Sequence, residues 1–416
     1  MIQLAFLLLH PAIIVTIGAT CESNAALFSV TPKSYEQVHY LRKLNLNNAT
    51  LDFWLLTTLV NREAHIKVPV NEVSIFQNDL LQWGLQPKII NSNLTACINT
   101  TRSERFARYN SIDSLDITKT YLRYSTMNHY IDYLGRKYSD IVSISTVGSS
   151  YDRRLLRTVT ISQQRNSLNS QAILIDAGIH AREWLAPATA LYVINQLVQH
   201  SDENHDLLNN LTWIILPLVN PDGYEHSLTK DKFWRKNRHP FRQCVGSDVN
   251  RNFDFHWGEK GVSRHECGQT YPGPKPFSEP EARVVRKLLL SKNDSIKFYL
   301  TLHSYGRYLM YPWGYRKGLP QTWRTMDTVA RAGAAAMKQS HNVNYKIGGA
   351  GKILYEASGG SDDYALAIAR IPIALIMELP GDERGFHPAA SKLKPFLEEA
   401  FTGIRAMALK MMQLTV

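Results

Sequence analysis

Residues 173–187 read ILIDAGIHAREWLAP, and this stretch decides the fold. Its apolar, β-branched beginning predicts a buried strand, and its end predicts the start of a helix. Between the two stand His180 and Glu183, three positions apart. Functional side chains in α/β sheets gather at the carboxyl ends of strands, so this pair is a candidate site.

Strand and helix patterns alternate along the rest of the chain after residue 120. The predicted strands are IVSISTVG (141–148), LLRTVTIS (155–162), AILIDAGI (172–179), TWIILPLV (212–219), KFYLTLHS (297–304) and IPIALIME (371–378). The predicted helices cover 121–137, 184–199, 279–291, 321–340 and 388–412. Together they predict an α/β domain over residues 111–416 with a largely buried central sheet.

Two further strand ends carry residues of the same chemical kind, His303 and Glu378. His180, Glu183 and His303 together supply two imidazoles and one carboxylate. With one position left open, this is the ligand set of a catalytic zinc ion. Zinc in such a site turns a bound water into a nucleophile and polarises a carbonyl. The alternative for each histidine is a structural residue whose ring is satisfied by hydrogen bonds.

The N-terminal part has a pattern of its own. Helical spacing at 33–44 and 73–85 alternates with strand-like runs at 49–56, 64–70 and 86–94, which predicts an independent α+β module over residues 23–95. A polar connector follows at 96–110 and contains Arg102, Arg105 and Arg108. It is either a cleavage site for a trypsin-like protease or an ordinary solvated linker.

Several features indicate a secreted protein. Residues 1–22 have the apolar centre and small residues of a signal peptide, although they lack a basic start. A membrane anchor is the alternative, but Pro11 and the short apolar run argue against a span, and no later run is long enough. Glycosylation sequons begin at Asn48, Asn93, Asn99, Asn210 and Asn293.

The net charge is +11, but no long Lys/Arg run or base-stacking motif is present. We therefore expect a soluble basic surface and no nucleic-acid partner. The four cysteines are Cys21, Cys97, Cys244 and Cys267. In an oxidising compartment the last two predict a disulfide, the alternative being two free thiols. The absence of CxxC pairs argues against a structural zinc site.

Six motifs occur in a fixed order: HAREW (180–184), FWRKNR (233–238), DVNRNFDFHW (248–257), TLHSYGRYLMYPWGY (301–315), LYEASGGSDDYA (354–365) and IMELPG (376–381). Together they resemble the secreted zinc metallocarboxypeptidases of the carboxypeptidase A/B type, from about residue 25 to the C-terminus. The N-terminal module, with LDFW and KVPV, resembles the prosegment of these zymogens. The resemblance implies a mixed central β-sheet flanked by helices, preceded by a small antiparallel α+β prodomain.

The resemblance also implies a role for each matching residue. Zinc ligands are matched by His180, Glu183 and His303, and Asp248 matches the carboxylate that holds His180 by its other ring nitrogen. Glu378 matches the general base and Arg235 the group that stabilises the oxyanion. The clamp on the substrate's terminal carboxylate is matched by Asn250, Arg251 and Tyr355, and positions further back along the substrate by Arg182 and Tyr305.

The expected reaction is hydrolysis of the C-terminal peptide bond of peptides and proteins, with one zinc ion and after activation by a trypsin-like protease. Asp362 follows GGS, where this family has the base of the side-chain pocket, and Asp there accompanies release of Lys or Arg. The alternative is that Asp362 is satisfied internally and the pocket takes aromatic or aliphatic ends. Ala350 and Ile376 make the pocket less polar, and Pro380-Gly381 departs from the Arg-Asp that is usual in the vertebrate enzymes.

Two other classes of function stay open at this point. One is a catalytically silent homologue that binds C-terminal tails, although every expected catalytic position is filled. The other is a non-enzymatic extracellular partner that uses the basic surface, for instance on an acidic polysaccharide. Zinc without turnover would favour the first, and salt-sensitive heparin retention unaffected by Glu378→Gln would favour the second.

Overall fold

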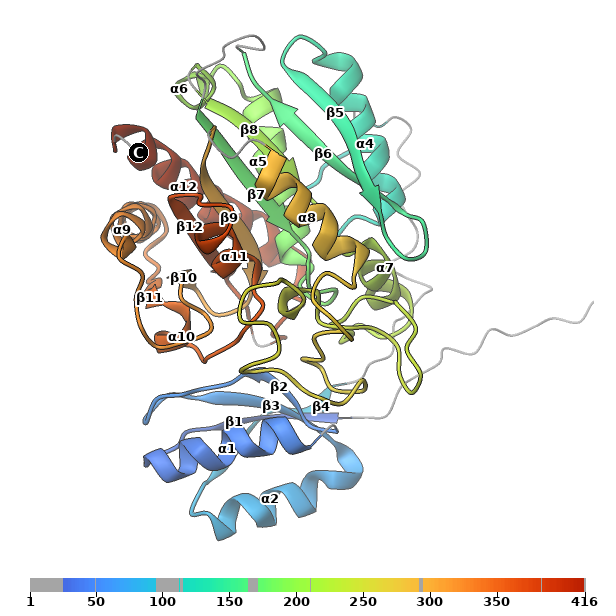
Figure 1. Ribbon diagram of the computed structural model, residues 1–416, viewed down its shortest axis with the longest axis vertical. Coiled ribbons are helices and arrows are strands. Elements are labelled where there is room, and N and C mark those ends of the chain that lie inside the picture. Colours follow the sequence, from blue (N-terminus) through green and yellow to red (C-terminus); the bar gives the residue numbers. More distant parts are fainter. Residues whose placement is uncertain are drawn as a thin grey trace, which may run out of the picture.

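The computed structural model describes residues 25–48, 50–94, 112, 115–163, 171–209, 211–291, 295–382 and 384–414. The predicted leader 1–22 and connector 96–110 lie outside these residues, as do Cys21 and Cys97. The described chain forms two units, each built on its own β-sheet (Figure 1). The smaller unit comes first in the sequence and lies against one end of the larger.

The small unit is an antiparallel sheet in the order β2-β3-β1-β4, with two helices on the face away from the large unit (Figure 1). Its elements are β1 (Ala25–Val30), α1 (Tyr35–Asn47), β2 (Asp52–Leu55), β3 (Ala64–Pro69), the short helix η1 (Val70–Glu72), α2 (Val73–Gln82) and β4 (Pro87–Leu94). The expected small antiparallel α+β architecture of this unit is thus confirmed.

Strand β1 is central to this sheet, yet its sequence pattern does not predict it. All six of its residues are buried, so no alternation of apolar and polar side chains marks the strand. Phe28 and Val30 pack into the core under the two helices. Ala25 and Leu27 point to the other face, where they pack with Phe233 of the large unit. Both faces of β1 are therefore in apolar contact.

The large unit is built on a sheet in the order β11-β10-β12-β9-β7-β8-β6-β5. Its strands are β5 (Val142–Ser149), β6 (Leu155–Ile161), β7 (Gln171–Ala177), β8 (Leu211–Leu216), β9 (Ile296–Ser304), β10 (Tyr308–Tyr311), β11 (Lys346–Gly349) and β12 (Ile373–Leu379). The central strands β12, β9, β7 and β8 are parallel. Because β10, β6 and β5 join in antiparallel fashion, the sheet is mixed, as expected.

Helices cover both faces of this sheet (Figure 1). One face packs against α4 (Tyr124–Lys137), α5 (Leu185–Gln199), α9 (Trp323–His341) and α12 (Ala390–Gln413). The other packs against α8 (Pro280–Ser291) and α11 (Ser361–Ala367). Successive β7 side chains alternate between the two cores, with Ile173 in one and Leu174 in the other. This double burial gives the strand its continuous apolar sequence.

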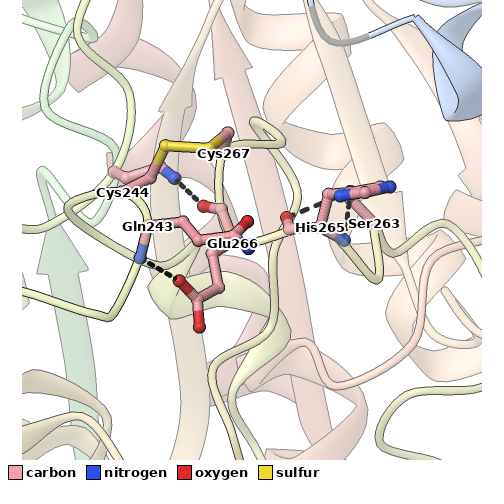
Figure 2. Close-up of a disulfide and its surroundings, with 7 residues drawn as sticks. Gln243, Cys244, Ser263, His265, Glu266 and Cys267 are labelled. Carbon is pink, nitrogen blue, oxygen red and sulfur yellow. Dashed lines mark hydrogen bonds between the residues drawn. A yellow bond between two sulfur atoms is a disulfide. The ribbon is translucent and has the colours of Figure 1, made fainter.

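A long irregular segment follows α7 (Pro221–Thr229) and reaches α8. Cys244 and Cys267 form a disulfide across it, which confirms that pairing (Figure 2). The Gln243 backbone N–H donates to Glu266 Oε2 at 2.7 Å beside the disulfide. The closed loop contains the short helix η3 (Val249–Arg251), and so the disulfide constrains several of the predicted site residues.

Three short elements complete the unit: α6 (His205–Leu208), α10 (Ala350–Ile353) and the strand pair formed by β10 and β11. The sequence patterns did not predict β10, β11 or α7. Each is short, and a four-residue strand carries too little periodicity to be recognised. No helix among the described residues is both long and apolar enough to cross a bilayer.

Candidate active site

The predicted metal ligands come from two adjacent parallel strands. His180 and Glu183 lie in the turn between β7 and α5, and His303 is the penultimate residue of β9. Gly178 makes this turn possible, since its φ of +68° is one that L side chains rarely adopt. A Cβ there would also lie 2.8 Å from Pro187 and Leu218 side-chain atoms. The parallel register then brings the two strand ends together.

The three side chains form a buried ligand set. His180, Glu183 and His303 are 4%, 3% and 2% exposed. Glu183 Oε1 lies 2.8 Å from His180 Nδ1, and Glu183 Oε2 lies 3.1 Å from His303 Nδ1. One ligand atom from each residue lies within 4.8 Å of the others, close enough to hold one metal ion. Two imidazoles and a carboxylate suit zinc in both type and number.

The charges of the two histidines also act on Glu183. Burial alone would raise the pKa of its carboxyl, but His180 and His303 outweigh that effect and lower it. The carboxylate therefore stays ionised, as a metal ligand must be. Its Oε2 also accepts a hydrogen bond from the Ser304 backbone N–H at 3.2 Å, which fixes its orientation.

Asp248 links one ligand to a guanidinium. Its Oδ1 lies 3.1 Å from His180 Nε2, and its Oδ2 accepts from Arg235 Nη2 at 2.9 Å. Burial opposes ionisation of Asp248, but the charges of Arg235 and Arg251 lower its pKa well below the usual value. Arg235 Nη1 lies 3.9 Å from Glu183 Oε1, so this guanidinium stands at the edge of the ligand set.

Glu378 lies opposite His303 in the pairing of β12 with β9. Desolvation and the neighbouring charge of Glu183 raise the pKa of its carboxyl to about 8. A carboxyl tuned toward neutral pH can both take and return a proton, the property required of a general base. Sequence and fold thus bring Glu378 to the cleft that His180, Glu183 and His303 line.

The three residues predicted to bind a terminal carboxylate also lie together. Arg251 Nη2 donates to Tyr355 Oη at 3.2 Å, and Arg251 Nη1 donates to the Asn250 carbonyl at 2.8 Å. Asn250 Oδ1 accepts from the Ser361 backbone N–H at 3.0 Å, at the start of α11. The guanidinium fork has the charge and shape of a carboxylate partner.

Asp362 lies in the first turn of α11 and is 3% exposed. Its Oδ2 is buried without a hydrogen-bond partner among the described residues. Burial raises the pKa of this carboxyl. It lines the same cleft as the apolar side chains of Met310, Ala350 and Ile376.

The small unit covers part of this cleft. Arg182 is 1% exposed, and Asp52 of β2 accepts hydrogen bonds from both of its terminal nitrogens. Trp54, two residues on, packs on Phe233 and Phe386 with ring centroids 5.1 and 5.2 Å apart. Two residues predicted to contact substrate are therefore held by the prodomain, since His65 Nδ1 also lies 3.0 Å from Tyr305 Oη.

Sequence reasoning did not assign a role to Asp52 or His65. The available signal was weak: LDFW places Asp52 and Trp54 on one face of a strand, but nothing in the pattern says what that face meets. Only the docking of the two units reveals the ion pair. Sequence reasoning also missed Phe386 of the large unit, whose ring centroid lies 4.3 Å from the Arg182 guanidinium carbon.

Comparison with known proteins identifies this arrangement. The family model described as zinc carboxypeptidase matches residues 127–403, and the model described as carboxypeptidase activation peptide matches residues 28–101. The chain belongs to the zinc carboxypeptidase family. It is an enzyme that uses one catalytic zinc and is made with an activation peptide, and His180, Glu183 and His303 are positioned to bind that ion.

Relatives of both specificity types are similar to this zinc carboxypeptidase. Carboxypeptidase B of Astacus astacus is 38% identical over 293 residues, 70% of this chain and 96% of the relative. Zinc carboxypeptidase A 1 of Drosophila melanogaster is 31% identical over 399 residues, 92% of this chain and 91% of the relative. The crystal structure of carboxypeptidase A from Helicoverpa armigera, at 29% identity, has a TM-score of 0.87 over 94% of this chain and 98% of that one.

Proposed function

We propose that this enzyme releases Lys or Arg from the C-termini of peptides and proteins. The observation that carries the proposal is the unpartnered, buried Oδ2 of Asp362 in the cleft. A buried carboxylate oxygen without a partner is costly, and the cationic end of a substrate side chain would supply that partner. The aliphatic stem of Lys or Arg would lie along Met310, Ala350 and Ile376.

The terminal carboxylate of the substrate is bound by Arg251, Asn250 and Tyr355. Arg251 supplies the charge, and the Asn250 amide and Tyr355 hydroxyl supply further donors. An internal peptide group carries no charge at this position and would leave the guanidinium without its partner. The clamp therefore restricts cleavage to the last peptide bond. Arg182 and Tyr305 would contact positions further back along the substrate once the prodomain has left.

Zinc, when bound by His180, Glu183 and His303, supplies an activated water and polarises the scissile carbonyl. Glu378 would take a proton from the attacking water and pass it to the leaving amine. Arg235 is held by Asp248 beside the ligand set and stabilises the negative oxygen that develops from the carbonyl. Asp248 also holds His180 through Nε2, which presents Nδ1 to the metal.

We divide the chain into a signal peptide at 1–22, a prodomain at 23–95, a connector at 96–110 and the catalytic domain at 111–416. Activation would occur by cleavage near Arg105 or Arg108, which lie outside the described residues, through a trypsin-like protease. The Asp52–Arg182 pair and the packing of Trp54 support a prodomain that blocks the cleft before cleavage.

We infer that the protein is secreted and acts outside the cell. The signal-like residues 1–22, the five sequons and the disulfide support this. Of the sequon asparagines, Asn48 is described, and its Oδ1 accepts from the Thr50 backbone N–H at 2.9 Å. The side chains of the other four sequon asparagines lie outside the described residues.

The test is release of the last residue from matched peptides that end in Arg or Phe, after limited trypsin treatment. We expect rapid release of Arg, abolished by a zinc chelator and strongly reduced by Asp362→Ala. Rapid release of Phe with Arg untouched would refute the role of Asp362 and favour the A-type preference. The apolar side chains of Met310, Ala350 and Ile376 are the observation on which that second candidate rests.

A further inference from the structure

The two metal-binding histidines differ in what holds their second ring nitrogen. His180 Nε2 lies 3.1 Å from the carboxylate of Asp248, whereas His303 Nε2 lies 3.2 Å from the hydroxyl of Thr301. His303 Nδ1 faces the ligand set, 3.1 Å from Glu183 Oε2. When Nδ1 binds a metal, Nε2 carries the proton and donates it to Thr301 Oγ1. The Thr301 hydroxyl must then give its own hydrogen to another acceptor.

Asp176 is the candidate for that acceptor. In the parallel pairing of β7 with β9, Asp176 lies directly opposite Thr301. Asp176 is 1% exposed, and its Oδ1 is without a hydrogen-bond partner in the described part of the chain. Burial raises the pKa of Asp176, and the hydrogen bond from Tyr299 opposes that rise. A buried carboxylate oxygen left in this way calls for a functional explanation.

The second oxygen of Asp176 is already engaged. Tyr299 Oη donates to Asp176 Oδ2 at 2.6 Å and lies 2.9 Å from Ser361 Oγ. Tyr299, Thr301 and His303 occupy alternate positions of β9 and so share one face of the sheet. Tyr299 thus holds Oδ2 of Asp176, whereas Oδ1 has no partner among the described residues and belongs to the residue opposite Thr301.

We propose that Asp176 is a positioning residue for the zinc ligand His303 and acts through the hydroxyl of Thr301. The carboxylate orients the hydroxyl so that its oxygen accepts from His303 Nε2, which holds the ring with Nδ1 toward the metal. Asp248 holds the His180 ring directly, with no hydroxyl between the carboxylate and the ring nitrogen. This inference rests on the zinc site and is independent of whether the enzyme prefers basic or apolar ends.

The alternative is that Asp176 only stabilises the fold by accepting from Tyr299. The two roles separate in zinc affinity, which a purely structural carboxylate would leave unchanged. Thr301→Val keeps the size of the side chain and removes the hydroxyl, while Thr301→Ser keeps the hydroxyl. Asp176→Asn keeps the size of the carboxyl and removes its charge. Because Asp176 also contacts Tyr299, Thr301→Val is the cleaner variant.

Thr158 offers a matched control. It is a buried threonine of β6 in the same sheet, 3% exposed, and its hydroxyl lies 3.4 Å from the Ser145 carbonyl. Thr158→Val therefore makes the same chemical change at similar burial but without a path to the metal site. Thermal unfolding of the chelator-treated zymogens would show that Thr158→Val and Thr301→Val cost similar stability without zinc.

The experiment is zinc affinity of the full-length zymogens, measured by competition with a chelator of known affinity. We expect Thr301→Val to bind zinc about ten to a hundred times more weakly than Thr158→Val, with Asp176→Asn weakened in the same direction and Thr301→Ser near wild type. Equal affinity of Thr301→Val and Thr158→Val would overturn the proposal. Full affinity in Asp176→Asn, with Thr301→Val weakened, would confine the effect to Thr301 and also overturn it. Arg release by Asp362→Ala has no bearing on these outcomes.

Discussion

Replacing Asp52 by Asn tests how the prodomain keeps the zymogen inactive. The Asp52 side chain is 10% exposed and the Arg182 side chain 1%, so the ion pair between them is almost fully buried. Trp54 Nε1 donates to the same carboxylate at 3.0 Å. The substitution keeps the size of the side chain but leaves the guanidinium of Arg182 buried without a counter-charge.

The cost falls only on the closed state, because Arg182 lines the cleft and can be hydrated when the prodomain leaves. Removing one partner of a buried ion pair costs about 3–5 kcal/mol, and we take the lower value because Asn still accepts one hydrogen bond. About 3 kcal/mol corresponds to about two powers of ten in the ratio of open to closed zymogen. Activity before cleavage should rise by a similar factor.

The assay is hydrolysis of an Arg-terminated peptide by uncleaved zymogen, followed by the same assay after trypsin. Asp79→Asn is the matched control, because Asp79 is exposed on α2, on the face of the prodomain away from the catalytic unit. We expect higher activity before trypsin for Asp52→Asn alone and equal activity for all proteins afterwards. Equal activity of the two variants before trypsin would refute the role that we give to the ion pair.

Three further results are expected. Glu378→Gln should lower kcat at least about a hundredfold with zinc content unchanged, since an amide cannot take the proton; near-normal turnover would exclude Glu378 as the base. Replacing both Cys244 and Cys267 by Ser removes a disulfide that joins residues 23 positions apart. The double substitution should lower the free energy of unfolding by about 3 kcal/mol in guanidinium titrations, and an unchanged midpoint would contradict this. Burial lowers the pKa of His387 from 6.5 to about 3. Because the unfolded chain then takes up a proton that the folded one does not, the free energy of unfolding should fall by up to about 1.4 kcal/mol per pH unit as the pH drops from 6.5 toward 3. His387→Leu should lack this loss, and parallel pH profiles of the two proteins would refute it.

The sequence predicted the long elements and the metal ligands well. The strand that ends before His180 is buried on both faces, so its apolar run was unmistakable, and β9 and β12 carry the same signal. The helices were placed to within a few residues because each has a long apolar stripe. By contrast, three strands carried no readable pattern. The residues of β1 are all buried and mostly small, and β10 and β11 have four residues each.

The sequence motifs named the charged site residues but not every partner that holds them. The site motifs named Arg182, but only the structure pairs it with Asp52 of the prodomain. They named His303, but not Asp176, which lies 127 positions earlier and opposite Thr301 in the next strand. Neither partner has a local signal, because the spacing between residues on different strands depends on the loops that join them.

The sequence by itself therefore determined the two units, the zinc ligand set and the class of reaction. The two units follow from periodicity, whereas the ligand set and the reaction follow from the resemblance of the ordered motifs to those of the zinc carboxypeptidases. The tertiary structure alone decided which charges meet, that Asp362 keeps an unpartnered oxygen, and that the prodomain covers Arg182 and Tyr305. These facts depend on distances between segments remote in the chain, which packing sets and local patterns do not encode.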